Sequence, residues 1–163
     1  MAWSASAAEK TPSNAVPSAT WSGTVTHVTD GDTLWVRPAS GGKPVRIRID
    51  GVDAPEICQP HGRAAKKALV SRLSNQPVSV QSFSRDSFGR LLARVTVMPK
   101  AIGSADVGEW LVREGHAWSY RYRRDNGPYA KQQAMARAAR KGLFATPRPE
   151  EPREFRKRHG ACN

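Results

Sequence analysis

Three of the five acidic residues between positions 30 and 56 could form a cation site with an associated water. Asp32 lies in an Asp-Gly-Asp turn, and Asp53 follows a strand-like run, so their side chains can converge from separate segments. Two carboxylates, together with carbonyl oxygens and waters, suit Ca²⁺ or Mg²⁺. Glu56 could then position or deprotonate a water molecule beside that cation. The alternatives are structural: solvated turns for the two aspartates and a helix cap for Glu56.

Two arginines are the cationic counterparts of these acids. Arg48 belongs to an alternating run, and Arg90 follows a four-residue turn at positions 86–89. Guanidinium groups can hold a phosphodiester through paired hydrogen bonds and stabilise the negative charge that develops during displacement at phosphorus. The alternatives are a salt bridge from Arg48 to Asp50, on the same strand face, and simple solvation of Arg90.

The elements that must position these residues follow from the hydrophobic pattern. Alternation and β-branched residues predict strands, and apolar side chains at helical spacing predict helices. The strands are expected at residues 21–29, 33–37, 45–50, 78–83 and 91–97, and the helices at residues 61–75, 106–114 and 128–141. This order predicts an α+β, mainly β fold, a five-stranded OB-type barrel with three helices. An α+β sandwich is the alternative.

The charge balance favours a polyanionic partner. The chain of 163 residues has 26 lysines and arginines against 14 acids, a net charge of +12. This charge permits DNA, RNA, anionic lipid or an acidic protein. No apolar run of about 18 residues exists, which excludes a membrane-spanning helix. The expected helix at residues 128–141 presents mainly Ala, Gln, Arg and Lys, which disfavours a membrane-surface protein.

Four segments of the chain together resemble the thermonuclease family, the staphylococcal-nuclease-like domains. They are VTDGDT at residues 28–33, RIDGVDAPE at 48–56, DSFGR at 86–90 and WLVREG at 110–115. Each segment is weak alone, but all four occur in the family's order and on the expected elements. The resemblance covers residues 21–144. It implies an OB-fold and Ca²⁺-dependent hydrolysis of DNA and RNA on the 5′-oxygen side, leaving 3′-phosphate ends.

The resemblance also implies roles for particular residues. Asp32, Asp53 and the backbone carbonyl of Ala54 match the ligands of one Ca²⁺ ion, which is favoured over Mg²⁺ and Mn²⁺. Ala54 stands where the family frequently has threonine, a change that a backbone ligand tolerates. Glu56 matches the proposed general base. The two catalytic arginines of the family match Arg48 and Arg90.

Aromatic residues are the candidates for substrate binding. Tyr120 and Tyr122 alternate with arginines in WSYRYRR at residues 118–124, a pattern that suits base stacking combined with phosphate neutralisation. The resemblance places two pocket tyrosines here, although one residue fewer separates them from Gly115. Phe88 stands where a tyrosine often occurs, so one phosphate-facing hydroxyl is missing. Packing beneath the final helix is the alternative role for the tyrosines.

The two cysteines, Cys58 and Cys162, predict a disulfide in a small nuclease of extracellular type. This bond would pin the C-terminal tail beside the loop that follows the acidic motif. Two free thiols in a reducing cytosol are the alternative. The expected location is outside the cytoplasm, periplasmic or secreted, with the native signal peptide not present in this chain.

The expected organisation is a single catalytic domain with two flanking segments. Residues 1–19 are expected to be a disordered leader, residues 20–146 the staphylococcal-nuclease-like domain, and residues 147–163 a basic tail. The protein is expected to act on DNA and RNA as a monomer without a membrane partner. The competing hypothesis is a non-catalytic OB-fold module that binds nucleic acid or a protein without cleaving anything.

Overall fold

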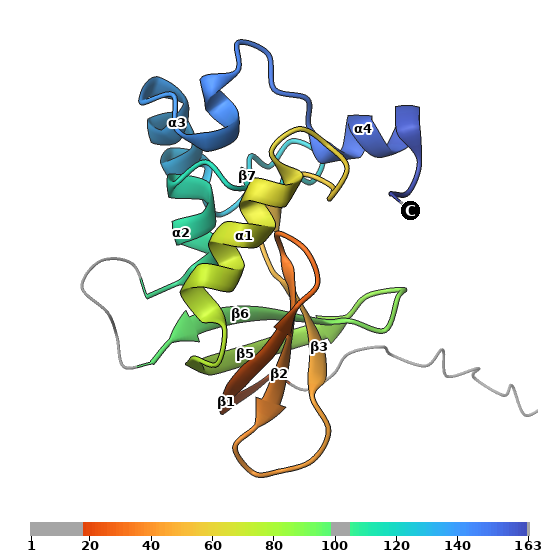
Figure 1. Ribbon diagram of the computed structural model, residues 1–163, viewed down its shortest axis with the longest axis vertical. Helices are drawn as coiled ribbons and strands as arrows, with labels where there is room; N and C mark the ends of the chain where they lie inside the picture. Colours follow the sequence, from red (N-terminus) through yellow and green to blue (C-terminus); the bar gives the residue numbers. More distant parts are fainter. Residues whose placement is uncertain (1–17, 99–104, 163) are drawn as a thin grey trace, which may run out of the picture.

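Five strands form a closed barrel in the computed structural model, which describes residues 18–98 and 105–162. The strands are β1 Ala19–Val28, β2 Thr33–Pro38, β3 Val45–Ile49, β5 Pro77–Arg85 and β6 Leu91–Val97. They neighbour one another in the order β1-β2-β3-β6-β5, and β1 closes the barrel on β5 (Figure 1). The pairing of β3 with β6 is parallel. The predicted five-stranded, mainly β architecture is confirmed.

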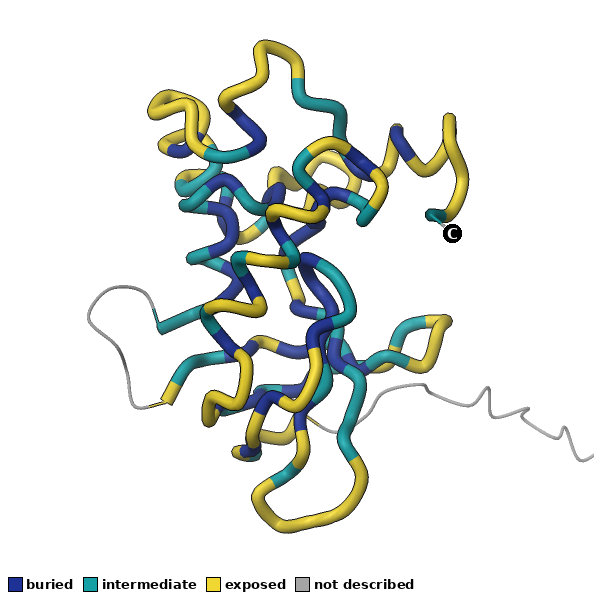
Figure 2. Tube along the Cα trace, viewed as in Figure 1, coloured by how far each residue is buried: buried dark blue, intermediate teal, exposed yellow. Residues whose placement is uncertain are grey.

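The barrel interior is filled by the apolar side of each alternating strand. In β3, Ile47 and Ile49 are buried, whereas Arg46 and Arg48 are only partly buried. Successive side chains of a strand point to opposite faces, so the same alternation that fills the core sends Arg48 to the outside of the barrel. Figure 2 shows the buried positions running through the barrel strands and into the helices above them.

In the part of the chain that the structure describes, four α-helices and one 3₁₀ helix accompany the barrel. They are α1 Gly62–Leu73, α2 Val107–Arg113, α3 Ala130–Ala138, the 3₁₀ helix Gly142–Ala145 and α4 Pro152–His159. A two-stranded sheet pairs β4 Val52–Asp53 with β7 Trp118–Ser119. This short sheet carries the acidic motif next to the Tyr-Arg segment, a proximity that the sequence pattern does not predict. Within the described residues, no helix has the length and apolar character needed to cross a membrane.

The two ends of the chain differ most from the sequence-based expectation. The predicted leader, residues 1–19, lies outside the described residues up to position 17, and β1 already begins at Ala19. Residues 147–163 were expected to be a basic tail, and within them residues 152–159 form α4. Pro152 occupies the first helical position, where its missing N–H costs nothing. Phe155 anchors the helix because it is buried.

Removing the buried anchor of α1 is expected to destabilise the fold. Leu69 is fully buried in the core, and the neighbouring Val70 is exposed. Leu69→Ala should lower the free energy of unfolding by about 2–5 kcal/mol, because it loses apolar burial and leaves a cavity. Val70→Ala should change it by no more than about 0.5 kcal/mol. Urea unfolding followed by circular dichroism measures both, and equal losses would contradict the packing of α1 described here.

Candidate active site

The two aspartates at Asp32 and Asp53 converge on the outside of the barrel. Asp32 lies in the turn between β1 and β2, Asp53 ends β4, and each is only 7% exposed. One carboxylate oxygen of Asp32 accepts a hydrogen bond from the backbone N–H of Ala54 at 2.8 Å. The other accepts one from the Thr33 hydroxyl at 3.2 Å. These bonds join the turn to the loop after β4, so neither aspartate is a solvated turn residue.

Arg48 links the two aspartates. Its Nη1 lies 3.3 Å from Asp32 Oδ2, and its Nη2 lies 3.4 Å from Asp53 Oδ1. Nη1 also donates to the backbone carbonyls of Ile49 and Val52, at 3.0 and 2.8 Å. The guanidinium is therefore fixed by backbone contacts as well as by charge. Its ion pairs in the described part of the chain are with these two acids and not with Asp50.

The carboxylates are held together at an electrostatic cost. Burial and the charge of Asp32 raise the pKa of Asp53, and the nearby arginines oppose this rise only in part. Burial and the same neighbour raise the pKa of Asp30 to about 6. Buried carboxylates that lie close together favour the binding of a cation. The cation offsets the repulsion between the carboxylates and the energetic cost of their burial.

The donor set fits a hard divalent cation. Asp32 and Asp53 offer two carboxylates, and backbone carbonyls and waters commonly complete the oxygen shell of Ca²⁺. Residues 18–98 and 105–162 contain no group of three or more His, Cys, Asp or Glu side chains that could hold a metal ion. A cation here would therefore have only two protein carboxylates among its ligands.

Glu56 lies on the loop after β4 and remains accessible. Its side chain is 29% exposed, and Oε1 lies 2.7 Å from Nη1 of Arg156. The cap position of α1 is His61, and no side-chain hydrogen bond caps that helix, so Glu56 does not act as its cap. Glu56 instead faces an open cavity of about 720 Å³. The other charged residues that line this cavity include Asp32, Arg48, Asp53, Arg90 and Arg156.

Arg90 is held by two contacts at the edge of the same cavity. Its Nε donates to Asp86 Oδ2 at 2.7 Å, and Asp86 also closes the turn by accepting the backbone N–H groups of Phe88 and Arg90. Its Nη1 donates to the Thr33 hydroxyl at 3.2 Å. Since that hydroxyl in turn donates to Asp32, Thr33 connects the arginine with the carboxylates. Thr33 and Asp86 were not among the predicted site residues.

The three aromatic candidates are all exposed, but only two line the cavity. Phe88 and Tyr120 are 77% and 46% exposed and belong to its lining. Tyr122 is 62% exposed, lies against the guanidinium of Arg123 and is not among the lining residues. The exposure of both tyrosines differs from the alternative in which they pack beneath the final helix.

The structure adds Arg156, from α4, to the predicted site. Its Nη1 lies 2.7 Å from Glu56 Oε1, and its Nη2 lies 3.3 Å from Asp53 Oδ2. Burial alone would lower the pKa of Arg156, but its hydrogen bonds and charge contacts with these two acids raise it overall. Arg156 therefore stays charged. A polar stretch near the end of the chain carries no motif that would single out this arginine.

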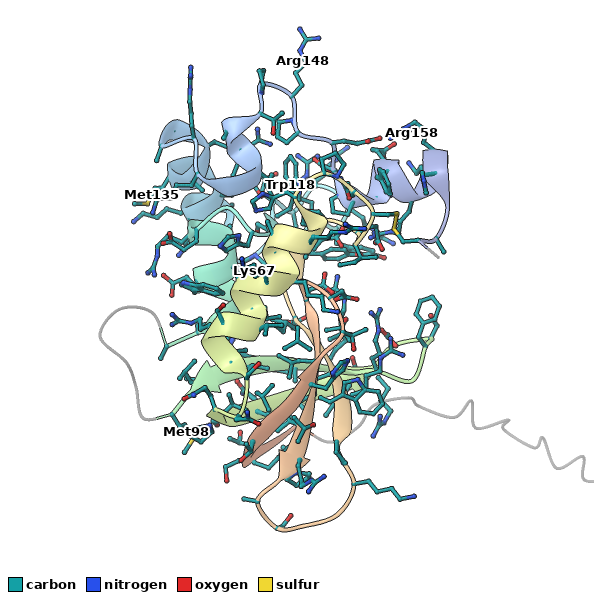
Figure 3. All side chains as sticks on the ribbon, viewed as in Figure 1. Lys67, Met98, Trp118, Met135, Arg148 and Arg158 are labelled. Carbon is teal, nitrogen blue, oxygen red and sulfur yellow. A yellow bond between two sulfur atoms is a disulfide. The ribbon has the colours of Figure 1, made fainter. Side chains whose placement is uncertain are left out.

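The predicted disulfide explains how α4 reaches the cavity. Cys58 and Cys162 are bonded, with 5.6 Å between their Cα atoms (Figure 3). Gln59 adds a second tie, because its Nε2 donates to the backbone carbonyl of Glu150 at 2.7 Å. Both ties start from the loop that carries Glu56, so the C-terminal segment is fastened beside the candidate base.

Comparisons with known proteins cover most of the chain. Residues 46–146 match the model of the family described as staphylococcal nuclease homologue. A "Probable staphylococcal-like nuclease CAN1" of Oryza sativa subsp. japonica is 34% identical over 74% of this chain and 35% of its own length. An "Uncharacterized endonuclease" of Escherichia coli O157:H7 is 35% identical over 83% of this chain and 85% of its own length. The chain thus spans about a third of the rice relative and most of the bacterial one.

Proposed function

Because the chain belongs to the staphylococcal nuclease family, we propose that it is a Ca²⁺-dependent nuclease that hydrolyses both DNA and RNA. The proposed products carry 3′-phosphate ends. The observation that carries this proposal is the cavity that gathers two buried aspartates, an accessible glutamate and two fixed arginines. A module that only binds nucleic acid would gain nothing from burying two carboxylates close together.

The metal-binding part of the proposal rests on Asp32 and Asp53. Together with the Ala54 backbone carbonyl, they would hold one Ca²⁺ ion, which would supply positive charge to a phosphate oxygen of the substrate. Thr33 and the Ala54 amide hold the Asp32 carboxylate in place. Arg48 forms ion pairs with both carboxylates.

Glu56 and the two arginines would perform the hydrolysis. Glu56 accepts a proton from the attacking water, for which its accessible position in the cavity is suitable. Arg48 and Arg90 hold the phosphate and stabilise its developing charge, and their other hydrogen bonds keep the guanidinium planes oriented. Water supplies the proton to the leaving 5′-oxygen, because an arginine side chain holds its proton too tightly to be a good acid.

Exposed aromatic and basic residues would bind the rest of the substrate. Phe88 and Tyr120 offer stacking surfaces beside the reacting phosphate. We retain Tyr122 as a stacking residue further along the strand, outside the cavity itself. The net charge of +12 supports binding to the backbone that is sensitive to salt and largely independent of sequence.

The setting of the enzyme is part of the same proposal. We place the catalytic domain at residues 20–146 and expect a monomer, since one chain supplies every residue named in the cavity. The Cys58–Cys162 disulfide supports an exported protein, because such bonds persist in oxidising compartments.

Cleavage assays on three substrates test the proposal. Single-stranded DNA, duplex DNA and RNA are incubated with the purified chain in Ca²⁺ or in excess EGTA. We expect degradation of all three in Ca²⁺, fragments that end in 3′-phosphate, and at least a hundredfold slower cleavage in EGTA. Binding without Ca²⁺-dependent degradation would reject the enzyme and favour the binding module.

A further inference from the structure

Arg156 occupies the carboxylate cluster as a cation would. Its guanidinium contacts both oxygens of Asp53, each at 3.3 Å, and Glu56 at 2.7 Å. One positive group thus neutralises the proposed metal ligand and the proposed base together. It comes from α4, which lies beyond the residues that match the family model.

The segment that carries Arg156 is attached to the rest of the protein by a few specific contacts. Residues 150–162 are tied to the loop after β4 by the disulfide and by the bond from Gln59 to Glu150. Glu151 adds an ion pair with Arg121 at 3.1 Å, and Phe155 is the buried apolar anchor. The Arg156 side chain itself stays 42% exposed. The segment, which we call the strap, therefore covers the cavity edge through a few contacts that can be separated.

Arg48 also contacts Asp53, but it is held more firmly than Arg156. It is carried by a barrel strand, is 14% exposed and is bonded to two backbone carbonyls, so it cannot leave without disrupting the barrel. Arg156 has no such backbone contacts among the interactions described, and its partners are the two acids. A divalent cation that binds Asp53 would face Arg156 at a few ångströms, where like charges repel.

We propose that the strap is an inhibitory element in which Arg156 competes with the divalent cation for Asp53 and Glu56. The Cys58–Cys162 disulfide attaches the end of the strap to the loop that carries Glu56. Arg156 is therefore held at a high effective concentration beside the site. Without the bond, as in a Cys58→Ser/Cys162→Ser chain, the strap can leave, and the enzyme needs a lower Ca²⁺ concentration. This inference rests on the proposed function, since it describes how the same metal site is regulated.

Calorimetric titration with Ca²⁺ alone tests the competition without any substrate. The wild-type chain is compared with Arg156→Gln, with Arg153→Gln as a control for net charge on the same helix, and with the double variant Cys58→Ser/Cys162→Ser. Arg153 is exposed on α4 and does not line the cavity. We expect Arg156→Gln to lower the Kd for Ca²⁺ at least about tenfold, because the charge of Arg156 then no longer repels the ion. Arg153→Gln should lower it less than threefold.

The double cysteine variant tests the disulfide. It should also lower the Kd for Ca²⁺, and adding Arg156→Gln to it should bring little further change. The two kinds of variant disturb the contact by different means, so a folding defect in one, seen by circular dichroism, leaves the other decisive. A full Arg156→Gln effect in the cysteine variant would reject the role of the disulfide.

The outcomes separate this inference from the proposed function. Equal Kd values for wild type and Arg156→Gln, with Ca²⁺-dependent cleavage intact, would overturn the strap alone. A lower turnover of Arg156→Gln at saturating Ca²⁺ with an unchanged Kd would also overturn it, because Arg156 would then serve the substrate. Failure of every chain to bind Ca²⁺ would overturn both proposals.

Discussion

Glu56→Gln is expected to slow phosphodiester cleavage by about 10²–10⁴-fold at saturating Ca²⁺ and substrate, the usual contribution of a positioned general base. Glutamine has nearly the same shape but cannot accept the proton of the attacking water. The side chain is 29% exposed and caps no helix, so the substitution should leave the fold intact. The measurement is the turnover rate on single-stranded DNA, with substrate binding followed separately by fluorescence anisotropy.

A matched control separates catalysis from a simple loss of charge. Glu154 is an exposed acid on α4 whose carboxylate pairs with Lys157. Glu154→Gln removes the same charge without altering the candidate base, and it should retain nearly the wild-type turnover rate. A Glu56→Gln enzyme within threefold of wild type would remove Glu56 from the role of base.

Arg90→Lys is expected to lower the turnover rate by about 10²–10³-fold, the cost of removing one donor that stabilises transition-state charge. Lysine keeps the positive charge but lacks the planar fork that bonds Asp86 and Thr33 at the same time. Because the charge remains, the affinity for DNA and its salt dependence should change little. Steady-state kinetics at several salt concentrations should therefore show a loss in kcat with KM nearly unchanged.

The same hairpin provides the control for Arg90. Arg85 donates from Nη1 to the carbonyl of Gly89 and is exposed. Arg85→Lys makes the same chemical change in the same turn, and we expect less than a threefold effect on turnover. Equal losses for Arg85→Lys and Arg90→Lys would show that turn geometry, and not contact with the phosphate, explains the effect.

The barrel could be predicted because a short local sequence pattern indicates each of its strands. In β3, alternation places Ile47 and Ile49 inside and Arg48 outside, and this pattern is visible in five consecutive residues. The convergence of Asp32 with Asp53 depends on separate segments. The sequence suggested it through their positions at a turn and after a strand-like run, and through the order of four short motifs. The pairing of β4 with β7 could not be predicted, because two-residue strands have no detectable period.

The strap shows what local patterns cannot reveal. In α4, Pro152 and Phe155 are the buried residues of the helix, and the rest of the segment is strongly charged. Such a segment has the composition of a solvated tail, and a proline at the helix start was its one readable signal. The position of Arg156 depends on the disulfide between Cys58 and Cys162, which are 104 residues apart. The cysteine pair predicted where the tail attaches but not which side chain it delivers.

The pairing of Asp53 with Trp118 also means that the site forms only when the chain has folded. β7 belongs to the second half of the chain, and β1 must close on β5 before the barrel is complete. Barrels whose contacts join such distant residues fold slowly, in about milliseconds to seconds. A partly synthesised or partly folded chain would have the acids and arginines but not their arrangement. Hydrolytic activity would therefore arise only at the end of folding, after the chain has acquired its native topology.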